Sequence, residues 1–230
     1  ARKLDDLPLV AGLLRARGRG RTAGGHVEKA MDDLSAALQV AHGLRDLHLL
    51  ALVHADTGEA YEKKADYAAA SDYLLRALEL AQSGTSRDVQ SAALRVLTAL
   101  GRVSLRAQAL DRALRFFEQG LKLAEALDQS AQAGKILGNL AGVYHAQKDY
   151  ETAAKFADRS LGLAQDCQDQ IGIARQLNNL GTLYLDMNQL AVASQHFDRA
   201  YKAARQAGWR EGMANAAAGR ERAARQGALA

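Results

Sequence analysis

Two pairs of side chains, each made of one cation and one amide, could together bind an extended acidic segment. Lys135 and Asn139 form the first pair, and Arg175 and Asn179, with Asn178 beside it, form the second. A spacing of four residues places both members of a pair on one face of a helix. The cation neutralises a carboxylate, and an Asn side chain both donates to and accepts from a peptide backbone. The pattern predicts recognition of a peptide.

The histidines and the cysteine do not form a metal site or a nucleophilic site. Where histidines cluster, at His42, His48 and His54, they are six residues apart. Six residues correspond to about 600° of helical turn, so that the three rings point in different directions. The one cysteine, Cys167, is expected to lie at a helix end and to be inert. We therefore expect no metal and no cofactor. The complete set of histidines is His26, His42, His48, His54, His145 and His196.

Neighbouring carboxylates and a glycine-rich stretch are also poor candidates for catalysis. Asp5 and Asp6, like Asp32 and Asp33, are adjacent in the sequence and would point about 100° apart on a helix. We interpret them as solvated surface. The glycines between residues 18 and 25 lack the sequence of a phosphate-binding loop and are expected to follow a helix. The sequence therefore predicts that the chain is not an enzyme.

The composition favours an all-helical fold. The chain has 230 residues, of which 48% are apolar, 24% charged and 5% aromatic, and it contains one proline. A sandwich or barrel needs more turn, β-branched and aromatic residues. No stretch approaches the roughly 20 apolar residues of a membrane span, and there is no secretory signal. A single cysteine fits a reducing cytoplasm. The missing initiator Met fits a processed chain or part of a longer protein.

Positive charge is concentrated at the two ends of the chain. The net charge of +4 is the sum of +4 over residues 1–25, +5 over residues 199–230 and −5 between them. Nucleic-acid binding would require a basic stripe with aromatics or a recognition helix beside it. The short Arg-Gly run from Gly18 to Arg21 and the lone Trp209 do not supply one. We expect solvated helix ends rather than a nucleic-acid partner.

A repeat of about forty residues organises the chain. The segment from Leu137 to Tyr144 (LGNLAGVY) matches the segment from Leu177 to Tyr184 (LNNLGTLY). Each unit reads as two amphipathic helices joined by a short polar turn. Three residues before second helices are expected to cap them: Asp66, Asp149 and Asn188. The alanines in the second helices are spaced by 40, 43, 40 and 40 residues: Ala30, Ala70, Ala113, Ala153 and Ala193.

The chain resembles the tetratricopeptide-repeat family from about Leu4 to Gln206. The fifth unit matches the family pattern throughout, with Leu180, Gly181, Tyr184, Ala193, Phe197 and Ala200. The departure is length, because the usual unit has about 34 residues. The resemblance implies one all-α domain over residues 1–230, a right-handed superhelical solenoid of antiparallel helix pairs. The expected repeats cover residues 4–43, 44–84, 85–127, 128–167 and 168–207, and a capping helix covers 209–226, where Trp209 closes the core or docks a partner.

The resemblance also implies a function. In this family the first helices line a concave groove, and similar Lys/Asn and Arg/Asn positions bind peptides. The groove is predicted to be basic and amide-rich in the later units and acidic in the second, at Asp56, Glu59 and Glu62. The expected ligand is an acidic peptide or an acidic helix face. The predicted peptide-binding residues are Arg95, Arg102, Lys135, Asn139, Arg175, Asn178 and Asn179.

Two other interpretations stay open. These side chains could serve only to solvate a concave surface. Alternatively, the chain could be a sensory or regulatory module of a larger bacterial signalling protein, acting by intramolecular contact or by self-association. An Ala-rich capping helix is compatible with a homodimer.

Overall fold

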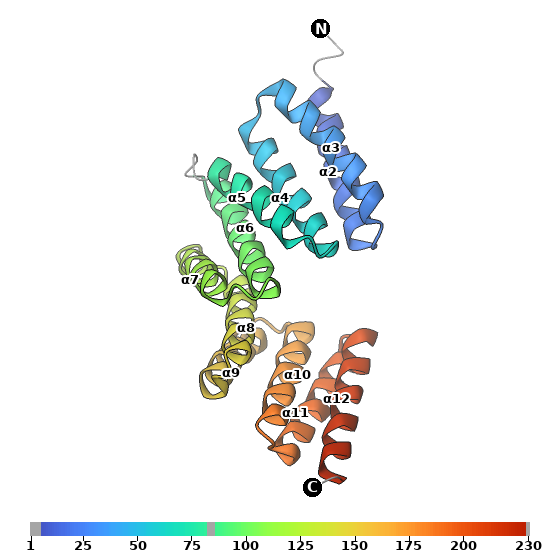
Figure 1. Cartoon of the computed structure of the whole chain (residues 1–230), viewed down its shortest axis with the longest axis vertical. Coiled ribbons are helices and arrows are strands. Elements are labelled where there is room, and N and C mark those ends of the chain that lie inside the picture. The colour runs from blue at the N-terminus through green and yellow to red at the C-terminus, as the bar shows by residue number, and fades with distance from the viewer. Residues whose placement is uncertain (1–5, 82–85, 229–230) are drawn as a thin grey trace. The chain divides into compact units, whose positions relative to one another are not determined.

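The computed structural model describes residues 6–81 and 86–228, and within them it contains eleven α-helices and no strand (Figure 1). This confirms the predicted all-α helical repeat solenoid. The expectations that involve Leu4 and Asp5 lie outside the described residues, as does the expected repeat boundary at 84/85. None of the described helices is both long enough and apolar enough to cross a membrane. The chain divides into two compact units, residues 1–123 and residues 124–230.

Unit 1 contains five complete helices and most of a sixth. Its core is a series of small clusters between successive helices, such as Leu34 and Ala37 of one helix with Val53 of another, all fully buried. The helices are α2 (Leu7–Ala23), α3 (Val27–Leu44), α4 (Leu47–Lys63), α5 (Tyr67–Ala81), α6 (Arg87–Arg106) and α7 (Leu110–Ala126), the last of which ends in unit 2.

Unit 2 continues the same pattern. Leu177 and Leu180 pack with Ala153 and Ala157 in its largest cluster, and Trp209 packs with Ala174 and other residues in a smaller one. The expectation that Trp209 closes the core is thereby confirmed. The helices are α8 (Ser130–Ala146), α9 (Tyr150–Asp166), α10 (Gln170–Asp186), α11 (Leu190–Gln206) and α12 (Arg210–Ala228). The predicted single domain and the five repeat boundaries stay predictions.

Both before and after the connection between α5 and α6, the turns between helices repeat every twenty residues. In each connection that the structure describes completely, one residue adopts a left-handed backbone conformation with a φ between 54° and 80°. Two backbone hydrogen bonds close the turn, as when Lys148 N donates to His145 O and Asp149 N donates to Tyr144 O, both at 2.9 Å. The left-handed residues are Gly25, Arg45, Ala65, Gln108, Asp128, Lys148, Gln168, Asn188 and Gly208. A forty-residue repeat is thus two helix-plus-turn segments of twenty.

Stacked rings join the two helices of three pairs, and in each pair the rings are twelve residues apart. The ring of Tyr184 lies parallel to that of His196, with centroids 5.1 Å apart. Equivalent stacks join Tyr61 to Tyr73 at 5.3 Å and Tyr144 to Phe156 at 5.2 Å. Glycines provide the space that other aromatic rings need. A Cβ on Gly181 would lie only 2.7 Å from ring atoms of Phe197. Small residues thus lie where helices pack closely, and aromatic rings fill the remaining space.

Three expectations about individual residues are wrong. Asp66 and Asp149 do cap helices, accepting hydrogen bonds from Ala69 N and Thr152 N at 3.1 Å. Asn188, by contrast, is the left-handed residue of its turn, and Gln189 occupies the N-cap position without a side-chain hydrogen bond. A position in the turn that favours Asn for its conformation is easily mistaken for a cap.

The other two corrections concern the N-terminal region of the chain. Gly18 lies within α2 and not after a helix, and a Cβ there would come within 2.8 Å of the Leu34 side chain of α3. Asp33 is buried and not solvated, since Arg17 and Arg21 each donate to it at 2.6 Å. The Arg17 guanidinium, through its hydrogen bond, lowers the pKa of Asp33.

Candidate functional site

Helices α8 and α10 of unit 2 carry most of the predicted binding residues and pack side by side. The amide of Gln176 on α10 fills the space above Gly138 on α8, where a Cβ would clash with it. Gln176 is buried, with 5% of its surface exposed. At the C-terminal ends of the two helices, His145 Nε2 of α8 lies 2.6 Å from Asp186 Oδ2 of α10. These two contacts fix the surface between α8 and α10.

The two predicted cations of this surface are exposed and have no acidic partner among the residues that the structure describes. Lys135 makes no ion pair. The guanidinium of Arg175 lies 5.6 Å from the centre of the Trp209 ring, in a cation–π contact. A cation–π contact uses the face of the guanidinium and does not consume its N–H donors. Both positive charges are therefore available to an external anion.

The three predicted amides lie at the same surface and differ in how far they are buried. Asn139 and Asn178 are half-buried, and Asn179 is exposed. Asn179 Nδ2 donates to Gln176 Oε1 at 3.3 Å, which leaves its oxygen free. The buried Asn178 Oδ1 has no hydrogen-bond partner in the described structure. The exposed oxygen of Asn179 can pair with a peptide backbone, whereas the oxygen of Asn178 is covered by the protein.

A small cavity of about 150 Å³ opens beside Asn179. Gly142 and His145 of α8 line it together with Thr182 of α10, and Ala153 and Ala157 of α9 contribute to its lining. Gly142, His145, Thr182 and Asp186 were not among the predicted binding residues. Gly142 and Thr182 are forty residues apart, so the repeat register gives them equivalent places. His145 and Asp186 are 41 residues apart, and the register does not predict their contact.

Arg95 and Arg102 belong to unit 1 and already have acidic partners. Arg95 Nη2 donates to Asp56 Oδ1 at 2.9 Å, and Arg102 Nη2 donates to Glu62 Oε2 at 2.6 Å. A role in ligand binding for these two arginines stays a prediction. The groove at the second repeat, residues 44–84, is not simply acidic as expected, because these arginines neutralise Asp56 and Glu62. The predicted set thus separates into Lys135, Arg175 and three amides in unit 2, and two paired arginines in unit 1.

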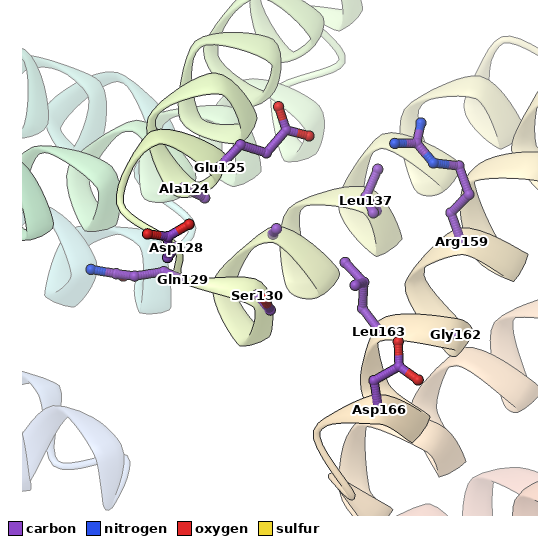
Figure 2. Close-up of a pocket in the computed structure, with 11 residues that line it drawn as sticks. Ala124, Glu125, Asp128, Gln129, Ser130, Leu137, Arg159, Gly162, Leu163 and Asp166 are labelled. Atoms are coloured by element: carbon purple, nitrogen blue, oxygen red, sulfur yellow. The ribbon is translucent and has the colours of Figure 1, made fainter.

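Figure 2 shows a larger cavity of about 480 Å³ in unit 2, bounded by the end of α7, the start of α8 and by α9. Leu137 and Leu163 form an apolar part of its lining. Its charged residues are three carboxylates and one cation: Glu125, Asp128, Asp166 and Arg159. An acidic ligand would meet net repulsion there. The surface between α8 and α10 is therefore the better candidate for the predicted acidic ligand.

Two tetratricopeptide-repeat sequence models match the chain, one over residues 132–206 and one over residues 53–83. The chain belongs to the tetratricopeptide-repeat family. Members of this family are typically non-catalytic scaffolds for protein interaction. Among the described residues of this tetratricopeptide-repeat chain, no group of three or more His, Cys, Asp or Glu side chains could hold a metal ion. A comparison with curated protein sequences gives no match.

Solved structures similar to this tetratricopeptide-repeat chain share its fold at low sequence identity. BtubC from P. vanneervenii is 20% identical, with 86% of this chain and 85% of that chain covered and a TM-score of 0.66. Aspartyl phosphate phosphatase F from Bacillus subtilis is 15% identical, and the match covers 91% of this chain and 54% of that chain with a TM-score of 0.81. The Rap conjugation gene regulator of plasmid pLS20, solved in complex with the Phr* peptide, is 18% identical, with 92% and 57% covered and a TM-score of 0.73. The chain spans about half the length of the last two.

Proposed function

We propose that this tetratricopeptide-repeat chain is a cytoplasmic scaffold that binds an acidic, extended peptide segment of a partner protein on the surface between α8 and α10. The observation that carries the proposal is the presence of two exposed cations, Lys135 and Arg175, without acidic partners on adjacent first helices. A surface cation that serves only for solubility does not require an amide on the same face of its helix. Here Asn139 and Asn179 accompany them, each four residues after its cation.

The dimensions of the surface suit an extended peptide. Neighbouring packed helices lie roughly 10 Å apart, and an extended chain advances about 3.3 Å per residue. Lys135 and Arg175 would then contact carboxylates about three residues apart. Asn179 would hydrogen-bond the peptide backbone between them, using a side-chain oxygen that has no partner in the described structure. The cations select acidic side chains, and the amides fix the register without selecting a sequence.

The likeness to the pLS20 Rap regulator supports a peptide ligand. That protein was solved in complex with a peptide and has the same fold over 92% of this chain. An extended ligand on the first helices is compatible with such a fold. The acidic character of the ligand rests on Lys135 and Arg175 alone.

Charge reversal tests the proposal. A fluorescent peptide with glutamates three residues apart should bind the natural chain, and Lys135→Glu with Arg175→Glu should weaken binding at least tenfold, because two charge-assisted contacts become repulsive. Arg199→Glu with Lys202→Glu is the matched control. These two exposed cations on α11 have no ion pair in the described structure, and the change in net charge is the same. Equal weakening by both double variants would contradict a specific site.

A second candidate function is a sensor module within a larger signalling protein. A similar fold occurs in a STAND signal-transduction ATPase from Pyrococcus horikoshii that has a tetratricopeptide-repeat sensor. The match covers 95% of this chain and 37% of that protein. If this chain acts by self-association instead of by peptide binding, light scattering should give the mass of a dimer. The double variant Lys135→Glu, Arg175→Glu should then have the same dimer mass as the natural chain. A monomer at all concentrations would argue against self-association.

A further inference from the structure

Unit 1 contains a cavity that the proposed function does not use. It has a volume of about 620 Å³ and lies between α2, α4 and α6. Small residues of α2 leave the space open, and a Cβ on Gly20 would meet no atom within 4 Å. The remaining lining is mostly charged. The residues around the cavity are Ala16, Arg19, Gly20, Thr22, Ala23, Asp56, Glu59, Glu62, Lys63 and Arg102.

Three guanidinium groups share one buried carboxylate at this cavity. The side chain of Asp56 on α4 is fully buried. Arg15 Nε donates to Asp56 Oδ2 at 2.6 Å, and Arg95 Nη2 donates to Asp56 Oδ1 at 2.9 Å. Arg19 Nε lies farther away, 3.7 Å from Asp56 Oδ1, and its side chain is 53% exposed. One negative charge cannot balance three positive charges, so positive potential remains here.

A second carboxylate of α4 is also shared. Glu62 pairs with Arg102 at 2.6 Å and with Arg106 at 3.3 Å. Together the two carboxylates of Asp56 and Glu62 face five arginines. Lys63, exposed at the end of α4, adds a further positive charge and has no ion pair in the described part of the chain.

Glu59, half-buried on α4, is the third carboxyl of the cavity, and it makes no hydrogen bond or ion pair in the described structure. Burial disfavours its charged form and raises its pKa, and nearby Asp56 acts in the same direction, while Arg95, Arg102 and Arg19 oppose the shift. Even with Glu59 counted as fully charged, the three carboxyl groups of Asp56, Glu59 and Glu62 face five arginines and Lys63. The cavity therefore keeps an excess of cations.

We propose that this cavity binds an oxyanion, the carboxylate or phosphate group of a protein partner's side chain, with Arg19 and Lys63 as its principal ligands. Arg19 is loosely held by Asp56 and has N–H groups to spare, and Lys63 is unpaired. Charge-assisted hydrogen bonds from guanidinium and ammonium groups are the usual means of holding such groups. The fixed pairs made by Arg15, Arg95 and Arg102 hold the three helices in place around the site. The inference does not rest on the peptide surface of unit 2.

Nuclear magnetic resonance titration of the isotope-labelled full chain tests this site. The probes are three acetylated, amidated tripeptides whose central residue is phosphoserine, glutamate or lysine. Phosphoserine or glutamate should shift backbone amides of α2 and α4, and Arg19→Ala with Lys63→Ala should weaken that binding at least tenfold. Arg115→Ala with Lys122→Ala is the matched control. These exposed cations on α7 have no ion pair in the described structure, and their removal should leave binding unchanged.

Glu59→Gln provides a second test, in which binding of the anionic peptides should become tighter and not weaker. Removal of a potential negative charge beside the oxyanion should tighten binding by about tenfold, an effect that damage to the fold would not produce. Shifts with phosphoserine alone identify phosphate as the ligand group, and shifts with both anionic peptides identify any oxyanion. Preferential binding of the lysine peptide, shifts confined to α8 and α10, or weaker binding by Glu59→Gln would each overturn the inference. Shifts confined to α8 and α10 would leave the function proposed for unit 2 intact.

Discussion

The guanidinium of Arg175 stacks on the ring of Trp209, 5.6 Å from its centre, so that the candidate binding surface on α10 is joined to the residue preceding the capping helix α12. Trp209 also packs with Ala174, Ala203 and Ala204, and its ring fills the space above Gly212. One side chain thus closes the core and orients a proposed ligand-binding cation.

Trp209 should report peptide binding directly, because it is the one tryptophan of the chain. A carboxylate that contacts Arg175 changes the charge beside the indole, so the fluorescence of the natural protein should change as an acidic peptide is added. Arg175→Ala should abolish this change. Trp209→Ala should lower the free energy of unfolding by about 2 kcal/mol, less than for a fully buried tryptophan. A fluorescence change that persists in Arg175→Ala would contradict the assignment.

Two helical glycines should respond in opposite directions to the same substitution. Gly181→Ala forces a Cβ to within 2.7 Å of the fully packed Phe197 ring and should destabilise the protein by about 1–3 kcal/mol. Gly162→Ala meets no atom within 4 Å and should stabilise by up to about 1 kcal/mol through helix propensity. Urea unfolding followed by circular dichroism measures both. Similar effects of the two substitutions would show that the close contact at Gly181 does not matter.

The fold was largely predictable because the repeat marks its contacts with residue types. Small residues at Ala153 and Ser160 and the large ring of Phe197 are all buried at positions that the register predicts. The turns were less predictable. Their left-handed residues include Arg45 and Gln168, whose types carry no signal for that conformation, since packing of the two flanking helices imposes it.

The candidate site was predictable only in part, because sequence register identifies a surface but not the pairing of its charges. Lys135 and Arg175 were found from their spacing. That Arg95 pairs with Asp56 depends on how side chains 39 residues apart meet across α4 and α6. The burial of Asp33 likewise depends on two arginines of α2. Such contacts between helices have no local sequence pattern.

Ala65 should be replaceable by glycine with a gain in stability. Its φ of 61° is costly for a residue with a Cβ, and it is exposed in the turn after α4. Ala65→Gly should raise the free energy of unfolding by about 1 kcal/mol. Ala68→Gly, three residues later and exposed within α5, should lower it by about 1 kcal/mol. Thermal and urea unfolding of the pair check the contrast, and a loss of stability in both would contradict the role of the left-handed turn.

Stability should decrease as the pH falls below about 6.5, because two histidines are held in their neutral form. Burial is the main cause that lowers the pKa of His54 and of His196, with nearby Arg76 and Arg199, respectively, adding to it. Between the folded and unfolded pKa values the unfolded chain binds more protons, so that stability rises with pH there and levels off above 6.5. Both Nδ1 atoms also lack hydrogen-bond partners in the described structure.

Denaturant unfolding at a series of pH values measures this effect. His54→Gln and His196→Gln should each flatten the dependence between pH 5 and about 6.5, whatever their effect on stability at neutral pH. His26→Gln, at an exposed position, is the control and should leave the slope unchanged. A slope that is the same in all three variants would assign the pH dependence to other groups.

A charge swap on the surface between α8 and α10 tests the central claim most directly. Calorimetric titration of the natural chain and of the Lys135→Glu, Arg175→Glu double variant should be made with a glutamate peptide and with its lysine counterpart. The natural chain should bind the glutamate peptide, and the double variant should bind it at least tenfold more weakly while gaining affinity for the lysine peptide. Unchanged binding of the glutamate peptide by the double variant would contradict it.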